Sequence, residues 1–298
     1  MGAVPLTTQL GDENRAPGRP ATRARRRWGL AWRHSGLLAL AAVLVAPGMW
    51  MVSASLMTQA EVLSGAILPA VPQWRNYVDI FDRFPFGVFF RNSVLVTGSV
   101  VLLNLLFCSM AGYALAKFNF LGKRLVFAFI LTTIMIPFTV IAIPLYLVVH
   151  QLGWINSYQG LVAPFAVSAF GIFLMRQFMA SIRDEYLDAA RVDGAGELRI
   201  FFVIVLPLAR PALMTLAILV FITNWDEFFW PLIAATSDEY RTLPVGLAKL
   251  QEAGTSSSTQ WHLIMAGATI AVLPIFVLFL AFRRQFMQAT SGLAGLNE

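Results

Sequence analysis

Charged residues and cysteine are both scarce in this chain. Asp, Glu, Lys and Arg together make up 13% of the 298 residues, which is about half of the roughly 25% typical of soluble domains. Hydrophobic residues make up 58%. The single cysteine, Cys108, excludes a disulfide or a cysteine metal site within one chain, and the three histidines are too scattered to suggest a metal site. This composition favours a polytopic membrane protein.

The motifs of an ATP-hydrolysing or covalent enzyme are also missing. No GxxxxGK[ST] phosphate-binding loop, Gly-x-Ser-x-Gly elbow or HExxH pair occurs in the sequence. We therefore expect no enzymatic activity and no cofactor bound by this chain.

The apolar runs between residues 90 and 177 hold no ionisable side chain away from their ends. Proton- or sodium-coupled carriers usually need such side chains inside the membrane, so an energy source outside the chain is favoured.

Six apolar segments are long enough to cross a bilayer, which takes about 20 residues. The first is expected to be an uncleaved span, because the core of a signal peptide is only about 7–15 residues long. Prolines inside four of the segments predict kinks. By hydropathy the fifth segment could begin near residue 200. The segments are 35–57, 90–115, 125–149, 158–177, the fifth ending near 233, and 262–282, so the predicted fold is an all-α bundle of six transmembrane helices.

Basic residues are distributed unevenly around these spans. With six spans and an inner N-terminus, seventeen of the 22 lysines and arginines lie on the inner side. Because cytoplasmic flanks carry the excess of basic residues, both tails are predicted to be cytoplasmic, and residues 58–89 extracytoplasmic. This bracketing of apolar segments argues against nucleic acid as a partner. Residues 1–34 are expected to be a disordered tail whose arginines anchor the topology or bind anionic lipid, and residues 283–298 the C-terminal tail.

The longest polar-bearing interval between apolar segments is Tyr186–Pro207. It begins with mixed charges, passes Gly194 and Gly196, and becomes apolar up to Pro207. Glycine supplies backbone freedom where a side chain would clash, and proline cannot continue a helix interior. The interval therefore predicts a short amphipathic helix, a glycine turn and a second helix, on the cytoplasmic side.

Asp188-Ala189-Ala190, followed by Gly194, Ile204 and Leu206-Pro207, resembles the EAA loop of the membrane subunits of bacterial ABC importers. Asp188 stands where that family usually has glutamate. The longer pattern DAARVDGAGELRIFFVIVLPLARPAL is similar to the carbohydrate-importer branch that includes the maltose permease subunits. The resemblance covers most of residues 70–285. It implies a type I permease core over 90–282 with a coupling loop at 184–207, and it places the fifth span at about 211–233.

The resemblance also implies a function, which is that of a permease subunit of an ATP-driven sugar importer in the bacterial inner membrane. The implied partners are a second homologous permease chain, two ATPase subunits that bind ATP and magnesium, and an extracytoplasmic sugar-binding protein, with membrane lipid around the spans. A self-contained carrier or channel for a small polar solute is the alternative, and a non-transporting scaffold is a third class. The residues assigned to ATPase coupling are Asp188, Ala189, Ala190, Asp193, Gly194 and Pro207.

A second polar stretch, Asn224 to Phe229, lies in the outer half of the fifth span. It resembles the Trp-Asn-Glu-Phe region of sugar permeases, with Asp226 in the asparagine position. Aromatic stacking and polar hydrogen bonds often hold sugars, so Asn224, Trp225 and Asp226 are candidate residues of the substrate pathway. The alternative is an interfacial aromatic belt that includes Trp225 and Trp230. Residues 250–260 are flexible by composition, and either contact the binding protein or form a plain linker.

Overall fold

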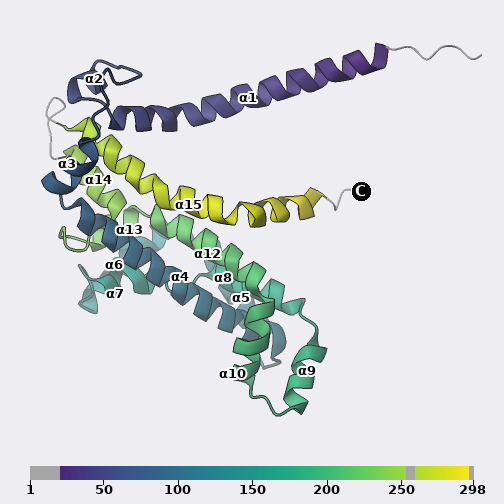
Figure 1. Ribbon diagram of the computed structural model, residues 1–298. Coiled ribbons are helices and arrows are strands. Elements are labelled where there is room, and N and C mark those ends of the chain that lie inside the picture. The colour runs from purple at the N-terminus through teal and green to yellow at the C-terminus, as the bar shows by residue number, and fades with distance from the viewer. Residues whose placement is uncertain (1–20, 253–258, 295–298) are drawn as a thin grey trace, which may run out of the picture. The chain divides into compact units, whose positions relative to one another are not determined.

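The computed structural model describes residues 21–252 and 259–294, and their regular structure is entirely helical (Figure 1). Contacts divide the chain into two units, residues 1–50 and residues 51–298. The helices are α1 (Ala21–Ser55), α2 (Gln59–Leu63), α3 (Asn76–Arg83), α4 (Phe86–Lys117), α5 (Lys123–Ile134), α6 (Phe138–Gln151), α7 (Tyr158–Val162), η1 (Ala163–Phe165), α8 (Ala169–Ala180), α9 (Asp184–Val192), α10 (Glu197–Ile200), η2 (Phe201–Val205), α11 (Leu206–Leu208), α12 (Arg210–Trp225), α13 (Phe229–Ala234), α14 (Leu243–Glu252) and α15 (Trp261–Ala294).

Helix α1 makes up the described part of the first unit and ends in the second. Its stretch His34–Ser55 has a mean hydropathy of 2.0 and is long enough to cross a membrane, close to the predicted span 35–57. Pro47 lies inside α1. The backbone is already helical from Ala21, so the structure differs from the disordered tail that was expected as far as residue 34. Residues 1–20 of that tail lie outside the described residues.

Helices α4 and α15 are the long apolar helices of the second unit. Phe86–Lys117 and Trp261–Phe282 both meet the length and hydropathy requirements for a membrane span, in agreement with the predicted spans 90–115 and 262–282. Pro274 lies inside α15 without ending it. The backbone of α15 stays helical to Ala294, so the helix includes most of the stretch that was expected to be a C-terminal tail.

The third and fourth predicted spans are bent pairs of helices, and the fifth begins with the second helix of another such pair. In the described part of the chain, three helices are long enough to cross a membrane, or up to six if each bent pair is one span. The pairs are Lys123–Ile134 with Phe138–Gln151, Tyr158–Phe165 with Ala169–Ala180, and Glu197–Leu208 with Arg210–Trp225, bent by 103°, 44° and 79°.

The kink expected within 125–149 is a full break, because α5 and α6 turn by 103° at Pro137. Pro137 precedes α6 with φ −60° and ψ 136°, an extended conformation. Proline has no N–H to donate and disfavours the helical conformation in the residue before it. Pro144, by contrast, lies inside α6.

The fifth span begins as predicted but ends early. Helix α12 starts at Arg210 and stops at Trp225, and α13 is a separate helix. Pro231 explains the break, because the ring of a proline clashes with the carbonyl four residues before it in a continuous helix, here that of Glu227. The Glu227 carboxylate instead accepts a hydrogen bond from the Trp230 N–H at 3.1 Å, at the start of α13.

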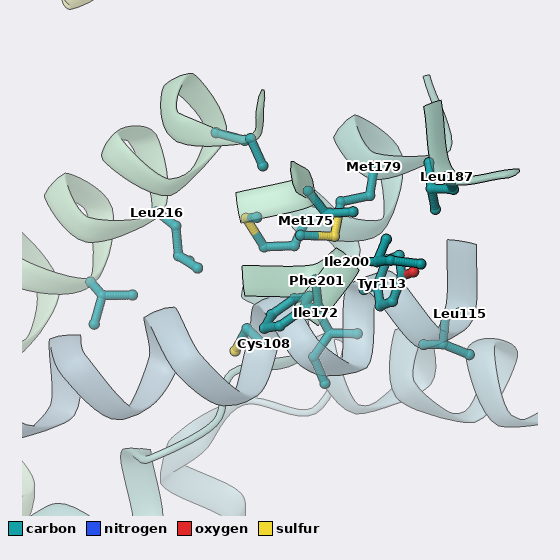
Figure 2. Close-up of a cluster of buried hydrophobic side chains, with 14 of the residues drawn as sticks. Cys108, Tyr113, Leu115, Ile172, Met175, Met179, Leu187, Ile200, Phe201 and Leu216 are labelled. Atoms are coloured by element: carbon teal, nitrogen blue, oxygen red, sulfur yellow. The ribbon is translucent and has the colours of Figure 1, made fainter. Parts of the chain in front are cut away.

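The main core lies where α4 contacts α8 and α12, and Figure 2 shows its buried side chains, with Cys108 of α4, Met175 of α8 and Leu216 of α12 in one cluster. Gly112 permits this close approach. A Cβ at Gly112 would lie 2.7 Å from the Cβ of Met175 and 2.8 Å from the backbone nitrogen of Arg176. Both distances are too short for a methyl group, and the backbone of α8 is one of the atoms in the way.

We expect Gly112→Ala to destabilise the protein by about 1–3 kcal/mol, the usual range for overpacking a filled core. Gly98 is the matched control, since it lies in the same helix and a Cβ there meets no atom within 4 Å. Gly98→Ala should be neutral or slightly stabilising, because alanine is the better helix former. The thermal midpoints of the two variants in detergent measure the difference, and equal midpoints would contradict the close packing of α4 on α8.

Candidate functional site

The segment between α8 and α12 has the three parts that its sequence predicts. Helix α9 carries Asp184 and Glu185 in its first turn and Arg191 in its last, the charge order that the helix dipole favours. Gly194 follows with φ +80°, a left-handed conformation that costs other residues about 1–2 kcal/mol. The chain then continues through α10, a π-helical turn (η2) and α11. Figure 1 shows α9 and α10 together at one end of the second unit.

Leu187 anchors α9 to the rest of the protein. Its side chain is 1% exposed and belongs to the main core cluster, with Met179 of α8, Ile200 of α10 and Tyr113 of α4 (Figure 2). Its neighbour Tyr186 is 54% exposed. One apolar residue of this short helix is therefore buried, and its burial decides which face of α9 remains outside.

Arg191 connects α9 to α10 across the glycine turn. Its Nε donates to Glu197 Oε1 at 2.7 Å, and one of its terminal nitrogens donates to Asp188 Oδ1 at 2.8 Å. The hydrogen bonds to Glu197 and then to Asp188 raise the pKa of the guanidinium. Tyr113 Oη donates to the second Glu197 oxygen at 2.9 Å. Glu197 thus ties both α9 and α4 to the start of α10.

A second contact fixes the start of α9. Lys117, the last residue of α4, places its Nζ 2.6 Å from Asp184 Oδ1, and the same ammonium donates to the carbonyl of Ile182. The Lys117 side chain is 6% exposed whereas that of Asp184 is 73% exposed. The Lys117 ammonium lowers the pKa of Asp184, first by its hydrogen bond and then by its charge. Because Asp184 is in water, the pair orients the chain more than it stabilises it.

The residues assigned to ATPase coupling do not all lie on one surface. Asp188, Ala189 and Asp193 are exposed, but Ala190 is half-buried and packs against the main core. A Cβ at Gly194 would meet no atom within 4 Å, so this position needs glycine for its backbone conformation and not for space. The last predicted residue, Pro207, is exposed within α11.

The opposite end of α4 holds a different loop. Asn92 Nδ2 donates to the carbonyls of Glu239 and Arg241 at 2.8 and 2.9 Å, and Ser93 Oγ accepts from the Leu243 N–H at 2.8 Å. A helix rises 1.5 Å per residue, so Asn92 and Lys117 are roughly 38 Å apart along α4. The hydrocarbon core of a bilayer is about 30 Å thick. The loop before α14 and the segment with α9 therefore lie at opposite ends of a helix long enough to cross it.

Between these ends lies a cavity of about 400 Å³. It is bounded by the middle of α4, by the chain around the start of α8, and by the last turns of α12. Its walls are largely apolar, with a few polar groups directed into it, as is common for small-molecule sites. The lining residues are Asn104, Phe165, Val167, Ser168, Phe170, Leu219, Val220, Thr223, Asn224 and Glu227.

The three predicted pathway residues have three different environments. Asn224 lines the cavity. Trp225 is 4% exposed, stacks on Phe221 and donates its Nε1–H to the Ala271 carbonyl at 3.0 Å, so it holds α12 to α15. Asp226 is exposed at the break after α12 and does not line this cavity. Trp230 is fully buried and donates to the Gly160 carbonyl at 2.9 Å, so an aromatic belt of Trp225 and Trp230 does not fit this packing.

Asn104 and Glu227 are cavity residues that the sequence reasoning missed. Asn104 is a polar residue in an apolar run, buried in the structure, and its amide donates to the carbonyls of Val100 and Phe165 at 3.0 and 2.7 Å. Its isolation among apolar residues could have identified Asn104 as a candidate site residue from the sequence. Glu227 adjoins the predicted residues, but its position depends on the break before Pro231.

Comparisons with known proteins agree with this fold. The family described as "Binding-protein-dependent transport system inner membrane component" matches residues 108–291. The "Arabinooligosaccharides transport system permease protein AraQ" of Halalkalibacterium halodurans is 35% identical over 85% of this chain and 91% of the relative. The "Lactose transport system permease protein LacG" of Rhizobium radiobacter is 33% identical over 86% of this chain and 93% of its own length.

A solved structure is similar over nearly the whole chain. It is that of a bacterial ABC transporter "involved in the import of the acidic polysaccharide alginate", and one of its chains matches with a TM-score of 0.79 and 26% identity, over 90% of this chain and 99% of that one. Fold and relatives together define the membrane permease subunit of an ABC importer. The chain belongs to the family of binding-protein-dependent transport system inner membrane components, and a self-contained carrier or channel is not favoured.

Proposed function

We propose that this chain is one of two permease subunits of an ATP-driven carbohydrate importer, and that it crosses the bacterial inner membrane six times. Two ATPase subunits and an extracytoplasmic sugar-binding protein complete the transporter. Two similar relatives are named for arabinooligosaccharide and lactose transport, which supports a sugar as the solute. The observation that carries the proposal is the match of 90% of the chain to one chain of an ABC importer.

In this proposal the segment with α9 faces the cytoplasm, as do both termini. Seventeen of the 22 basic residues lie on that side, as expected for cytoplasmic flanks. The loop held by Asn92 and Ser93, at the other end of α4, then faces the binding protein. Residues 253–258, within the stretch that is flexible by composition, lie outside the described residues.

The exposed face of α9 enters a groove on one ATPase. Asp188, Ala189 and Asp193 are available for this contact, and the apolar side chains of Tyr186 and Val192 beside them are 54% and 87% exposed. Ala190, Gly194 and Pro207 act indirectly, by shaping the segment. The sequence holds no phosphate-binding loop of its own, so ATP and magnesium bind the partner ATPases, and their closure moves α9.

The cavity beside Asn224 forms this subunit's half of the solute path. Asn104, Ser168 and Thr223 add hydrogen-bonding groups to its wall, which suits a polyhydroxylated solute. Trp225 supports the wall from behind by joining α12 to α15, and Asp226 lies at the exposed outer end of α12. The second permease subunit supplies the facing half.

Reconstitution of the complete transporter in liposomes tests the proposal, with a panel of neutral oligosaccharides as solutes. We expect uptake that requires ATP and the binding protein, that stops when the ATPase subunits are omitted, and that is indifferent to proton uncouplers. The solute-loaded binding protein should also raise the ATPase rate. Uptake by this chain without any ATPase would instead identify a carrier or channel.

A further inference from the structure

The cavity wall carries one acidic side chain and no basic one. Among the described residues that line it, Glu227 is the single ionisable residue, and the remaining polar ones are neutral amides and hydroxyls. A cavity that is mostly apolar screens charge less than bulk water does. The charge of Glu227 therefore acts over the whole of a space of about 400 Å³.

No cation neutralises this carboxylate within the part of the chain that the structure describes. The ion pairs there involve Asp79, Asp184, Glu185, Asp188, Glu197 and Asp238, and Glu227 is in none of them. The partner it has is the Trp230 N–H at 3.1 Å, a neutral donor. Its neighbour Asp226 adds a second negative charge at the exposed end of α12.

We infer that Glu227 makes this half of the path selective by charge, admitting uncharged sugars and repelling anionic ones such as uronates and sugar phosphates. The inference rests on the proposed function and adds a substrate class to it. Neutral sugar hydroxyls donate to a carboxylate in a charge-assisted hydrogen bond, whereas a second anion in the same space meets a like charge that a mostly apolar wall screens less than bulk water does.

Glu227 also has a purely structural role at the start of α13, and a suitable variant separates the two roles. Glu227→Gln keeps an oxygen that accepts from the Trp230 N–H but removes the charge. Glu227→Lys reverses the charge. A preference for cations that weakens in the glutamine variant and reverses in the lysine variant belongs to the charge.

The local potential can be measured without knowing the solute. Thr223 lines the cavity, so Thr223→Cys places a thiol there, in a Cys108→Ser background that removes the single native cysteine. The assembled transporter is then treated with a cationic and with an anionic methanethiosulfonate reagent, and the ratio of their reaction rates is compared with that for a free thiol. Ser64→Cys, on the exposed segment after α2, is the control.

We expect the cationic reagent to be favoured at the thiol of the Thr223→Cys variant, and the ratio to fall at least about tenfold on Glu227→Gln, given the strength of a like charge at short range in a poorly screening site. Glu227→Lys should favour the anionic reagent, and the control position should respond to neither variant. A ratio unaffected by Glu227→Gln overturns the charge selection, as does a thiol that neither reagent reaches. Either result leaves the proposed function standing if uptake still requires the ATPases, because that requirement is measured separately.

Discussion

Gly194→Val is expected to abolish solute uptake while leaving the chain inserted in the membrane. Gly194 has φ +80°, a region in which a β-branched residue is a genuine outlier. The strain, about 1–3 kcal/mol, lowers the population of the native turn by about 5- to 150-fold. A Cβ at this position meets no atom within 4 Å, so the core is undisturbed and the effect is confined to how α9 is presented.

Gly196 provides the matched control for this change. It lies two residues further on, a Cβ there also meets no atom within 4 Å, and its φ of −70° is open to any residue. Gly196→Val should therefore retain uptake, and Gly194→Asn should fall between the two because asparagine tolerates the left-handed region. ATP hydrolysis and uptake by reconstituted transporters give the coupling ratio. Equal ratios for the two valine variants would show that the turn does not transmit the ATPase movement.

Leu187→Ala is expected to release α9 from the body of the subunit. Removing a fully buried leucine side chain costs about 2–5 kcal/mol, whereas an exposed ion pair contributes about 0–1 kcal/mol. The side chains of Arg191 and Glu197 are 37% and 41% exposed, so their ion pair cannot compensate for the loss. Local opening of α9 should become at least about thirtyfold more frequent.

Limited proteolysis with trypsin measures this opening, because Arg183 and Arg191 flank Leu187 and an opened α9 exposes both to cleavage. Tyr186→Ala is the control, since Tyr186 is next in sequence and 54% exposed, so its truncation should leave the cleavage rate of the permease alone unchanged. Adding the ATPase subunits should protect the wild-type segment. If Leu187→Ala is cleaved no faster than Tyr186→Ala, the anchoring of α9 by Leu187 is wrong.

The features of the segment with α9 differ in how far the sequence determined them. The turn at Gly194 and the short helix before it were predictable, because both depend on local backbone preferences and on the order of charged and apolar residues. That Ala190 faces the protein's own core while Ala189 faces outward was not predictable, because it depends on where Leu187 is buried relative to Met179 and Ile200.

The residues of the cavity were also only partly predictable from the sequence. A polar stretch at 224–226 was visible in the sequence, but its three residues have different environments, since Trp225 packs between α12 and α15 while Asn224 faces the cavity. Asn104 and Ser168 reach the same wall from segments far apart in the chain. Which side chains share a cavity follows from helix packing, which composition and spacing leave open.

By itself the sequence determined that the protein is a helical membrane protein and where its apolar segments lie, because hydropathy acts on each segment separately. Only the tertiary structure decided that the third predicted span is two helices turned by 103° at Pro137, that α12 ends before Glu227, and that a single carboxylate faces the cavity. The physical reason is that a proline permits a break but does not fix its angle. The angle, and the side chains brought together by it, are set by the packing of α4 against α8 and α12.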